Sequence, residues 1–393
     1  MQRRTFMMFI GTRPEIIKMA PVFKALTQQG EQVCVVHSGQ HDSMAQGLYD
    51  FFGMPPDVSI DLHRKSPSLA HLTTSLLDAM EDVLNTHRAD AVVVQGDTST
   101  AMVGALVAYY HDLPVAHVEA GLRTWQREPF PEEKNRELIG RLAYWHFPPT
   151  PQARRNLLQE HIPAQHIYEV GNTVIDAALM ARDRLAGDSA ADPALHAPDL
   201  GSFLDAMQDR KLLLVTAHRR ENWGQPIRRI AQAVSELLRQ HPEVVAVWPV
   251  HPNPAVRKDI RSALEAIDED VRARLCLTEP ADYPSLIDLL SRCVFTLTDS
   301  GGIQEEASAF AKPVLVARES TERQELVDAG GAVLVGTDIA SIVAHAHAHA
   351  LLTDATLYQS MQLDSSPFGD GHSGQRIANI LGSDEGAMPQ NPS

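Results

Sequence analysis

The feature that most constrains this chain is a repeated alternation of short apolar runs with longer helical segments. A first series of candidate strands lies at residues 6–10, 32–38, 91–95, 115–118, 143–148 and 167–170. A second series lies at residues 211–216, 244–249, 275–278, 294–298, 313–316 and 332–335. Strands that are apolar along their whole length and are separated by helices are typical of parallel sheets covered on both faces. The pattern therefore predicts two doubly wound α/β domains.

The end of the first series marks a candidate domain boundary near residue 175. Residues 181–201 are rich in Ala, Asp, Pro and Gly and have no sustained hydrophobic period, which indicates the end of a connecting helix and a linker. We therefore expect residues 1–175 to form the first domain and residue 176 to begin the second. Residues 383–393 have the composition of a disordered tail.

Composition argues against nucleic-acid and membrane partners and indicates a reducing compartment. The 393 residues include 34 Lys and Arg against 50 Asp and Glu, so no basic footprint for nucleic acid is visible. No run approaches the ~18 apolar residues of a membrane helix. Cys34, Cys276 and Cys293 have neither disulfide-framework nor zinc spacing, which fits free thiols in a reducing cytosol. His345 and His349 share one face of an Ala-rich helix, a pattern more typical of a solvated face than of a metal site.

Two cations follow the first candidate strand. Arg13 and Lys18 lie near Gly11 and Pro14, residues that suit a tight turn and a first helical position. Both cations could face an anion at the helix N-terminus, although a capped helix with surface cations is the simpler interpretation. The turn lacks the G-x-G-x-x-G and G-x-x-x-x-G-K-[ST] patterns, which argues against a dinucleotide-dependent dehydrogenase and a P-loop NTPase.

Carboxylates follow two neighbouring strands of the first series. Asp97 and Glu119 each come just after an apolar run, and the segment PEEKNR adds Glu132 and Arg136. A single acid at a strand end could be a helix cap. Several acids at adjacent strand ends indicate an acid/base cluster, because carboxylates brought close together separate their pKa values into one acid and one base.

Different polar residues follow the strands of the second series. They are His218, His251, Ser300, Gly301, Gly302 and Glu306. Two glycines at a helix start expose backbone N–H groups that suit a pyrophosphate, and the acid that follows could accept hydrogen bonds from a ribose. The alternative is a tight strand-to-helix turn that carries an acidic residue. Carboxylates in one domain and a diphosphate site in the other predict an enzyme that acts on the sugar of a nucleotide sugar.

Eight short motifs then occur in order along the chain. They are GTRPEIIKMAPV, QGDTST, HVEAGLRT, PEEKNR, GNTVIDA, TAHRRENWG, PVHPNP and TDSGGIQEEA. Together they resemble the non-hydrolysing UDP-N-acetylglucosamine 2-epimerase family, from about Gly11 to Leu381. The resemblance implies two Rossmann-like domains in the glycosyltransferase-B arrangement. It also implies that the second domain ends at about residue 365 and that a last helix, at about 366–382, crosses back onto the first domain.

The resemblance also implies a function. Family members are cytoplasmic homodimers that use no NAD or metal and interconvert UDP-N-acetylglucosamine and UDP-N-acetylmannosamine, a precursor for surface polysaccharides. The implied mechanism eliminates UDP to give 2-acetamidoglucal and then adds UDP back. Asp97, Glu119 and Glu132 match the acid/base carboxylates, and His218 matches the histidine beside the leaving diphosphate. Candidate substrate-binding residues are Arg13, Lys18, Gln40, His41, Arg136, His251, Ser300, Gly301, Gly302, Glu306 and Arg323.

Two departures from the family pattern bear on the substrate and its regulation. Residues 125–130 (WQREPF) border the sugar and are one residue shorter than is usual, so a 2-epimerase for a modified UDP-sugar, such as a diacetamido uronic acid, is an alternative. A glycosyltransferase with the same layout and a catalytically inactive sensor are disfavoured by the three carboxylates. Ser75 stands where many members carry an Arg that helps bind a second substrate molecule as activator. We therefore hypothesise that such activation is weak or absent here.

Overall fold

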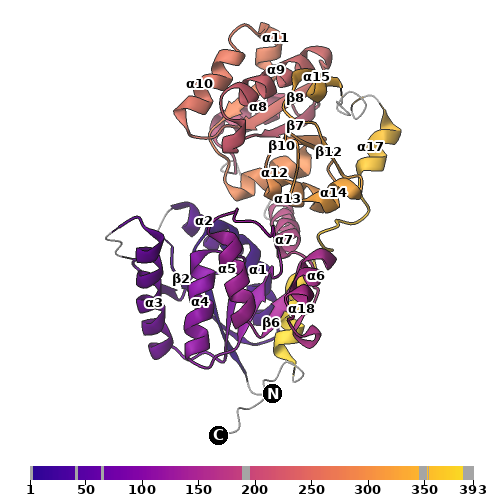
Figure 1. The fold of residues 1–393 in the computed structure, drawn as a ribbon. Coiled ribbons are helices and arrows are strands. Elements are labelled where there is room, and N and C mark those ends of the chain that lie inside the picture. The colour runs from indigo at the N-terminus through magenta and orange to yellow at the C-terminus, as the bar shows by residue number, and fades with distance from the viewer. Residues whose placement is uncertain are drawn as a thin grey trace. The chain divides into compact units, whose positions relative to one another are not determined.

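In the computed structural model the chain divides into two units, each built on a parallel sheet of its own (Figure 1). The structure describes residues 3–39, 43–62, 66–187, 195–344, 352 and 354–383. One unit comprises Met1–Ala177 with Phe368–Ser393, and the other comprises Ala178–Pro367. Helix α7 (Thr173–Gly187) passes from the first unit into the second. No helix of the described chain is long and apolar enough to cross a membrane.

The first unit is built on a parallel sheet of six strands in the order β3-β2-β1-β4-β5-β6. The strands are β1 (Thr5–Ile10), β2 (Gln32–His37), β3 (Val58–Ser59), β4 (Ala91–Gln95), β5 (Val115–Val118) and β6 (Trp145–Phe147). The central pair is in register with Met7 opposite Cys34. The order reverses between β1 and β4, and in open α/β sheets ligands bind beyond the carboxyl ends of the strands at such a point.

Helices cover both faces of this sheet. They are α1 (Arg13–Gln28), α2 (Ser43–Phe52), α3 (Leu69–Thr86), α4 (Ser99–Tyr110), α5 (Glu132–Leu142), α6 (Pro151–Gln159), the short η1 (Ala164–His166) and α18 (Ser373–Gly382). Helix α18 packs against α1. A Cβ on Gly374 would lie 2.7 Å from the backbone of Pro21, so only glycine permits this close approach. The Gly374 N–H also donates to Asp176 Oδ1 at 2.7 Å, which ties α18 to α7.

The second unit repeats the same topology, with strand order β12-β11-β10-β7-β8-β9. Its strands are β7 (Lys211–Thr216), β8 (Val244–Pro249), β9 (Leu275–Thr278), β10 (Phe295–Thr298), β11 (Val314–Val316) and β12 (Ala332–Leu334). Its helices are α8 (Pro198–Ala206), η2 (Arg220–Asn222), α9 (Gln225–Gln240), α10 (Pro254–Ala263), α11 (Glu269–Ala273), α12 (Tyr283–Arg292), α13 (Gly301–Ala309), α14 (Gln324–Asp328), α15 (Ile339–Ala344) and α17 (Ala355–Met361). The fully buried Trp248 lies in its core. Here the order reverses between β7 and β10.

The structure confirms the expected class of two Rossmann-like, doubly wound α/β domains, and it corrects two details. Residues 167–170 do not form a strand, because Ile167 makes only an isolated bridge to His146. The first sheet has its sixth strand in β3, which the sequence analysis did not predict because two residues are too few to show a hydrophobic pattern. Helix α7 continues to Gly187, inside the stretch 181–201 where the sequence indicates the end of a connecting helix. Of the expected tail, residues 383–393, all but Ser383 lie outside the described residues, and so does the stretch with His345 and His349.

Candidate active site

The loops beyond β1, β4 and β5 meet at the carboxyl edge of the first sheet. Gly11 follows β1, and a Cβ on it would lie 2.2 Å from Thr100 Oγ1, so the first loop packs directly against the start of α4. Asp97 follows β4 and Glu119 follows β5, as the sequence predicts. The strands that carry them are fully buried, so the polar residues begin where the hydrophobic core ends.

Glu119 has an unusual backbone and two polar partners. Its φ is +64°, in the left-handed region, which is uncommon and strained for a residue other than glycine. Its side chain is only 8% exposed and accepts a hydrogen bond from Lys18 Nζ at 2.5 Å. Gln95 Nε2 donates to the same carboxylate oxygen. The strained turn therefore holds the Glu119 carboxylate beside a cation from α1.

Asp97 is held by two residues of α5. Arg136 Nη2 donates to Asp97 Oδ2 at 2.5 Å, and Asn135 Nδ2 donates to the Asp97 backbone carbonyl at 2.8 Å. Burial raises the pKa of Asp97, Arg136 and Lys18 lower it, and the charge of Glu119 raises it. The structure thus brings Asp97 and Glu119 into one electrostatic cluster with two cations, an arrangement suited to proton transfer.

The other predicted residues of this unit, where the structure describes them, are not joined to the pair of Asp97 and Glu119. Glu132 is half-buried at the start of α5, and within the described chain it has no hydrogen bond or ion pair that joins it to the two acids. Arg13 is exposed and its Nη1 lies 3.0 Å from Met44 Sδ rather than from a carboxylate. Gln40 and His41 lie outside the described residues.

Glu15 is a buried carboxylate that the sequence analysis missed. It is 1% exposed and accepts hydrogen bonds from Gly11 N and from the hydroxyls of Thr12 and Thr98. Burial raises the pKa of Glu15 from 4.5 to about 7. The signal was present, because Thr12 and Glu15 have the T-x-x-E spacing of a capping box at the start of a helix. Glu15 therefore joins the loop after β1 to the loop after β4.

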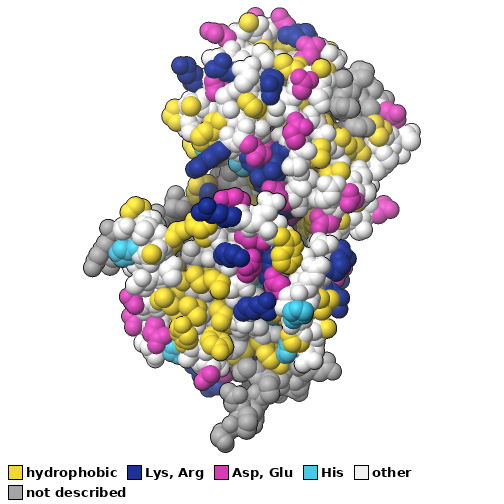
Figure 2. All heavy atoms as spheres, in the orientation of Figure 1, with side chains coloured by type: hydrophobic (Ala, Val, Ile, Leu, Met, Phe, Trp, Pro, Cys, Tyr) yellow, Lys and Arg dark blue, Asp and Glu magenta, His cyan; other side chains and the backbone are white. Residues whose placement is uncertain are grey.

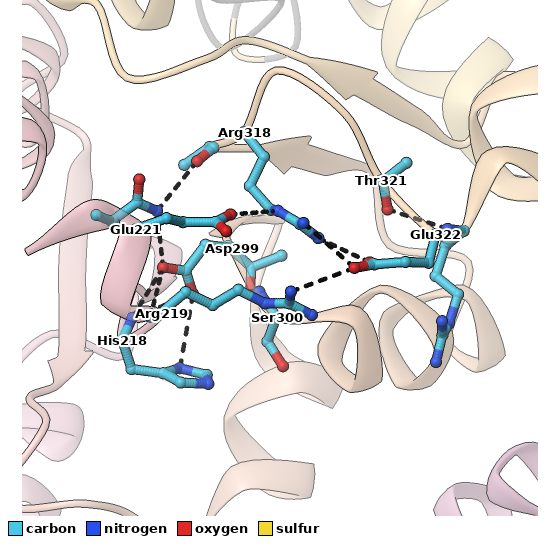
Figure 3. Close-up of polar contacts among 12 residues, drawn as sticks. His218, Arg219, Glu221, Asp299, Ser300, Arg318, Thr321 and Glu322 are labelled. Carbon is cyan, nitrogen blue, oxygen red and sulfur yellow. Dashed lines mark hydrogen bonds and ion pairs between the residues drawn. The ribbon is translucent and has the colours of Figure 1, made fainter. Parts of the chain in front are cut away.

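In the second unit, Asp299 joins the loops beyond β7 and β10 (Figure 3). Its carboxylate is fully buried and accepts hydrogen bonds from His218 N at 3.0 Å, Arg219 N at 2.9 Å and Asn222 Nδ2 at 2.8 Å. His218 Nδ1 lies 3.6 Å from the same group, while 48% of the His218 side chain is exposed. The imidazole of His218 is therefore anchored on one side and open on the other. Asp299 was not predicted as a site residue.

The N-terminus of α13 has the character of an anion site. Its N-cap, Ser300, makes no side-chain capping hydrogen bond to the helix. A Cβ on Gly301 would lie 3.5 Å from Arg323 Cζ and 3.7 Å from Arg219 Nη2, so two guanidinium groups border the first turn. Backbone N–H groups, the helix dipole and these cations all favour a phosphate there. Gly302 follows in the same turn.

The flanking residues of this turn are fixed by ion pairs. Arg323 Nε donates to Glu305 Oε1 at 2.6 Å, and Figure 3 shows Arg219 directed at Glu322. Glu306, expected to face a ribose, is 7% exposed. The predicted residues Ser300, Gly301, Gly302, Glu306 and Arg323 therefore lie in or beside one structural element.

His251 lies at the same edge of the second sheet. Its Nδ1 accepts the Asn253 N–H at 3.1 Å, and its ring centroid is 5.8 Å from that of Trp223. Trp223 Nε1 donates in turn to the His218 carbonyl at 3.2 Å. The indole therefore connects the two predicted histidines. Among residues that the structure describes, no three His, Cys, Asp or Glu side chains gather as a metal site.

The chain is similar to known proteins over nearly its whole length. A family model described as UDP-N-acetylglucosamine 2-epimerase matches residues 24–382. The chain is similar to the UDP-N-acetylglucosamine 2-epimerase of Yersinia pestis, with 43% identity over 94% of this chain and 96% of the relative. It is also similar to the solved structure of the Neisseria meningitidis UDP-GlcNAc 2-epimerase bound to UDP-GlcNAc, with 36% identity, a TM-score of 0.81 and 96% and 99% of the two chains covered. The S. aureus MnaA–UDP structure gives 36% identity, a TM-score of 0.83 and 99% coverage of each chain.

Proposed function

The chain belongs to the UDP-N-acetylglucosamine 2-epimerase family, and from this premise we propose that it interconverts UDP-N-acetylglucosamine and UDP-N-acetylmannosamine. The family and the fold class expected from the eight motifs, two Rossmann-like domains of the glycosyltransferase-B type, are confirmed. The observation that carries the proposal is the cluster of Asp97 and Glu119 with Arg136 and Lys18 beyond strands β4 and β5.

Epimerisation at C2 of the sugar requires more than a base that removes the C2 proton. The C2 hydrogen of the substrate is not acidic, so simple deprotonation is implausible. We propose that the anomeric C–O bond breaks with its electron pair leaving on UDP, while C2 loses its proton and a C1–C2 double bond forms. The resulting 2-acetamidoglucal accepts a proton at C2 on the opposite face, and the UDP oxygen adds back to C1.

The residues divide between the two halves of this reaction. Proton transfer on two faces needs two differently placed groups, and Asp97 and Glu119 are the first candidates, with Glu132 as a third. The departing UDP carries negative charge, which His218, Arg323 and the N–H groups at the start of α13 would stabilise. The remaining proposed substrate contacts are Arg13, Lys18, Gln40, His41, Arg136, His251, Ser300 and Glu306.

We propose the same biological setting as for the family: a cytoplasmic homodimer that supplies a surface polysaccharide precursor. Tyr109, Tyr110 and Leu138, on α4 and α5, are more than half exposed, and Figure 2 shows apolar side chains gathered over α3 and α4. Such a patch suits burial against a second copy of the chain. Light scattering of the purified protein should give twice the mass of the 43.2 kDa chain.

Proton exchange at C2 tests the proposed reaction. The protein is incubated with UDP-N-acetylglucosamine in D2O and followed by NMR, with a variant that combines Asp97→Asn and Glu119→Gln as the control for contaminating activity. Deuterium should appear at C2 of both epimers, and neither NAD nor EDTA should change the rate. Epimerisation with retention of the C2 proton would contradict elimination. Turnover of only a diacetamido UDP-sugar would favour the alternative substrate.

A further inference from the structure

Glu133 follows Glu132 on α5 but has a different environment. It is 0% exposed, whereas Glu132 is half-buried. A buried carboxylate is costly unless hydrogen bonds or a cation compensate its charge. Glu133 has both kinds of partner: Oε1 accepts the N–H groups of Thr124 at 3.0 Å and Trp125 at 2.9 Å, and Oε2 lies 3.4 Å from Arg136 Nη1.

Arg136 lies between two carboxylates. Its side chain is 11% exposed, with Nη2 on Asp97 and Nη1 facing Glu133. A guanidinium is planar and presents its donors in a rigid fork, so a carboxylate on one nitrogen fixes the direction in which the other donates. Glu133 therefore determines how Arg136 meets Asp97.

The two N–H donors begin a segment that exposes aromatic side chains. Trp125 is 57% exposed with φ of +58°, and Phe130 is 54% exposed with the Arg127 guanidinium 5.4 Å from its ring centroid. A left-handed backbone at a bulky residue is strained. The charge-assisted hydrogen bonds that Thr124 and Trp125 donate to Glu133 offset that strain at Trp125. Residues 124–130 are thus attached to the same carboxylate that holds Arg136.

We propose that Glu133 is a positioning residue of this enzyme, which orients Arg136 toward Asp97 and fixes the start of the aromatic segment 124–130. The proposal rests on the proposed function, in which Asp97 transfers a proton. Glu133 acts through Arg136 and through the backbone, so it need not contact the substrate.

The charges make the role measurable. Arg136 and Lys18 lower the pKa of Asp97, while burial and Glu119 raise it. The negative charge of Glu133 offsets part of the Arg136 charge. Glu133→Gln removes that negative charge and leaves the positive charge of Arg136 less compensated, which should move the titration of Asp97 to lower pH. A carboxylate that acted on neither Arg136 nor Asp97 would not move it. The loss of the carboxylate that orients the guanidinium should, separately, reduce turnover.

The test compares Glu133→Gln with Glu133→Asp and with Glu137→Gln as the control. Glu137 lies on the same helix and pairs with Lys134 near the surface. For Glu133→Gln we expect kcat for UDP-N-acetylglucosamine to fall ~10²-fold with KM little changed, and the limb of the pH profile that reports Asp97 to move to lower pH. Glu133→Asp keeps the charge, so it should lose turnover but keep that limb in place. Glu137→Gln should behave as the wild type.

Several outcomes would overturn the proposal. An unchanged kcat and pH profile in Glu133→Gln would show that Arg136 needs no orientation from this carboxylate. If Glu133→Gln does not fold, a wild-type kcat in Glu133→Asp would have the same meaning, since the shorter side chain cannot keep all three contacts. Asp97→Asn separates this proposal from the proposed function. If Asp97→Asn has lost its turnover while Glu133→Gln has the kcat and pH profile of the wild type, only the positioning role is refuted. A normal Asp97→Asn removes the premise.

Discussion

Replacing Glu15 with Gln is expected to make the protein progressively more stable, relative to the wild type, as the pH rises from about 4.5 to about 7. Glu15 is fully buried at the start of α1, and its partners are the Gly11 N–H and the hydroxyls of Thr12 and Thr98. None of these donors carries a charge. The effect of burial therefore outweighs that of these hydrogen bonds, and in the folded protein it raises the pKa of Glu15 from 4.5 to about 7.

The sign and size follow from this pKa. A carboxyl group whose pKa is higher in the folded than in the unfolded state favours folding while it is protonated, and this advantage is lost as the pH rises. Each pKa unit corresponds to about 1.4 kcal/mol, so the rise from 4.5 to about 7 makes the ionised group cost about 3 kcal/mol of unfolding free energy above pH 7. Glu15→Gln removes the ionisation. Its altered hydrogen bonds add an offset of about 1 kcal/mol that does not depend on pH.

Urea unfolding of both proteins at several pH values, followed by circular dichroism, measures the difference in unfolding free energy. The control is Glu169→Gln, because Glu169 is exposed on the same unit. The difference between Glu15→Gln and the wild type should grow by about 3 kcal/mol across the window, whereas the control should follow the wild type. Parallel curves for all three proteins would refute the reasoning, since they would mean that Glu15 ionises in the folded protein at no cost.

Three further predictions concern activity and packing. Asp97→Asn should reduce turnover ~10²–10⁴-fold with little change in UDP affinity, and near-normal steady-state kinetics would remove Asp97 from the acid/base set. Ser75, whose hydroxyl lies 3.2 Å from His71 Nδ1, cannot supply a bidentate donor for a second diphosphate. Reactions started from UDP-N-acetylmannosamine alone should therefore proceed without a lag; a lag abolished by a trace of UDP-N-acetylglucosamine would show that activation persists. Gly374→Ala should lower the unfolding free energy by about 1–3 kcal/mol, because its Cβ would meet Pro21; an unchanged melting temperature would contradict this.

The sequence predicted the carboxyl edges of both sheets because polar residues there directly follow apolar strands. Asp97 and Glu119 illustrate this, because a parallel sheet brings the residues that follow neighbouring strands to the same edge. The prediction was wrong at 167–170, where an apolar run makes one bridge, and it missed the two-residue strand β3. Pairing at sheet edges depends on what the neighbouring chain offers, which a local hydrophobic pattern does not contain.

The burial of individual carboxylates could not be predicted in the same way. Glu132 and Glu133 are adjacent in one motif, and only the packing of α5 decides that the second faces inward. Glu15 had a capping-box spacing, but that spacing says nothing of Thr98, which is distant in sequence and completes its hydrogen bonds. Asp299 follows a strand as a cap would, yet its donors come from the loop after another strand.

Three loops are each held by a buried carboxylate, from Glu15, Glu133 and Asp299. Each is a buried carboxylate near a carboxyl edge, and each accepts backbone N–H groups of a loop. Basic side chains are fewer than acidic ones in a chain with a formal net charge of −16, and these three buried acids are compensated largely by uncharged donors. Loops are fixed without using up the site's cations, so Lys18 and Arg136 remain available to the acids at the site. Glu133 also lies beside the Arg136 guanidinium, which is why its charge, unlike that of Glu15, is expected to affect turnover.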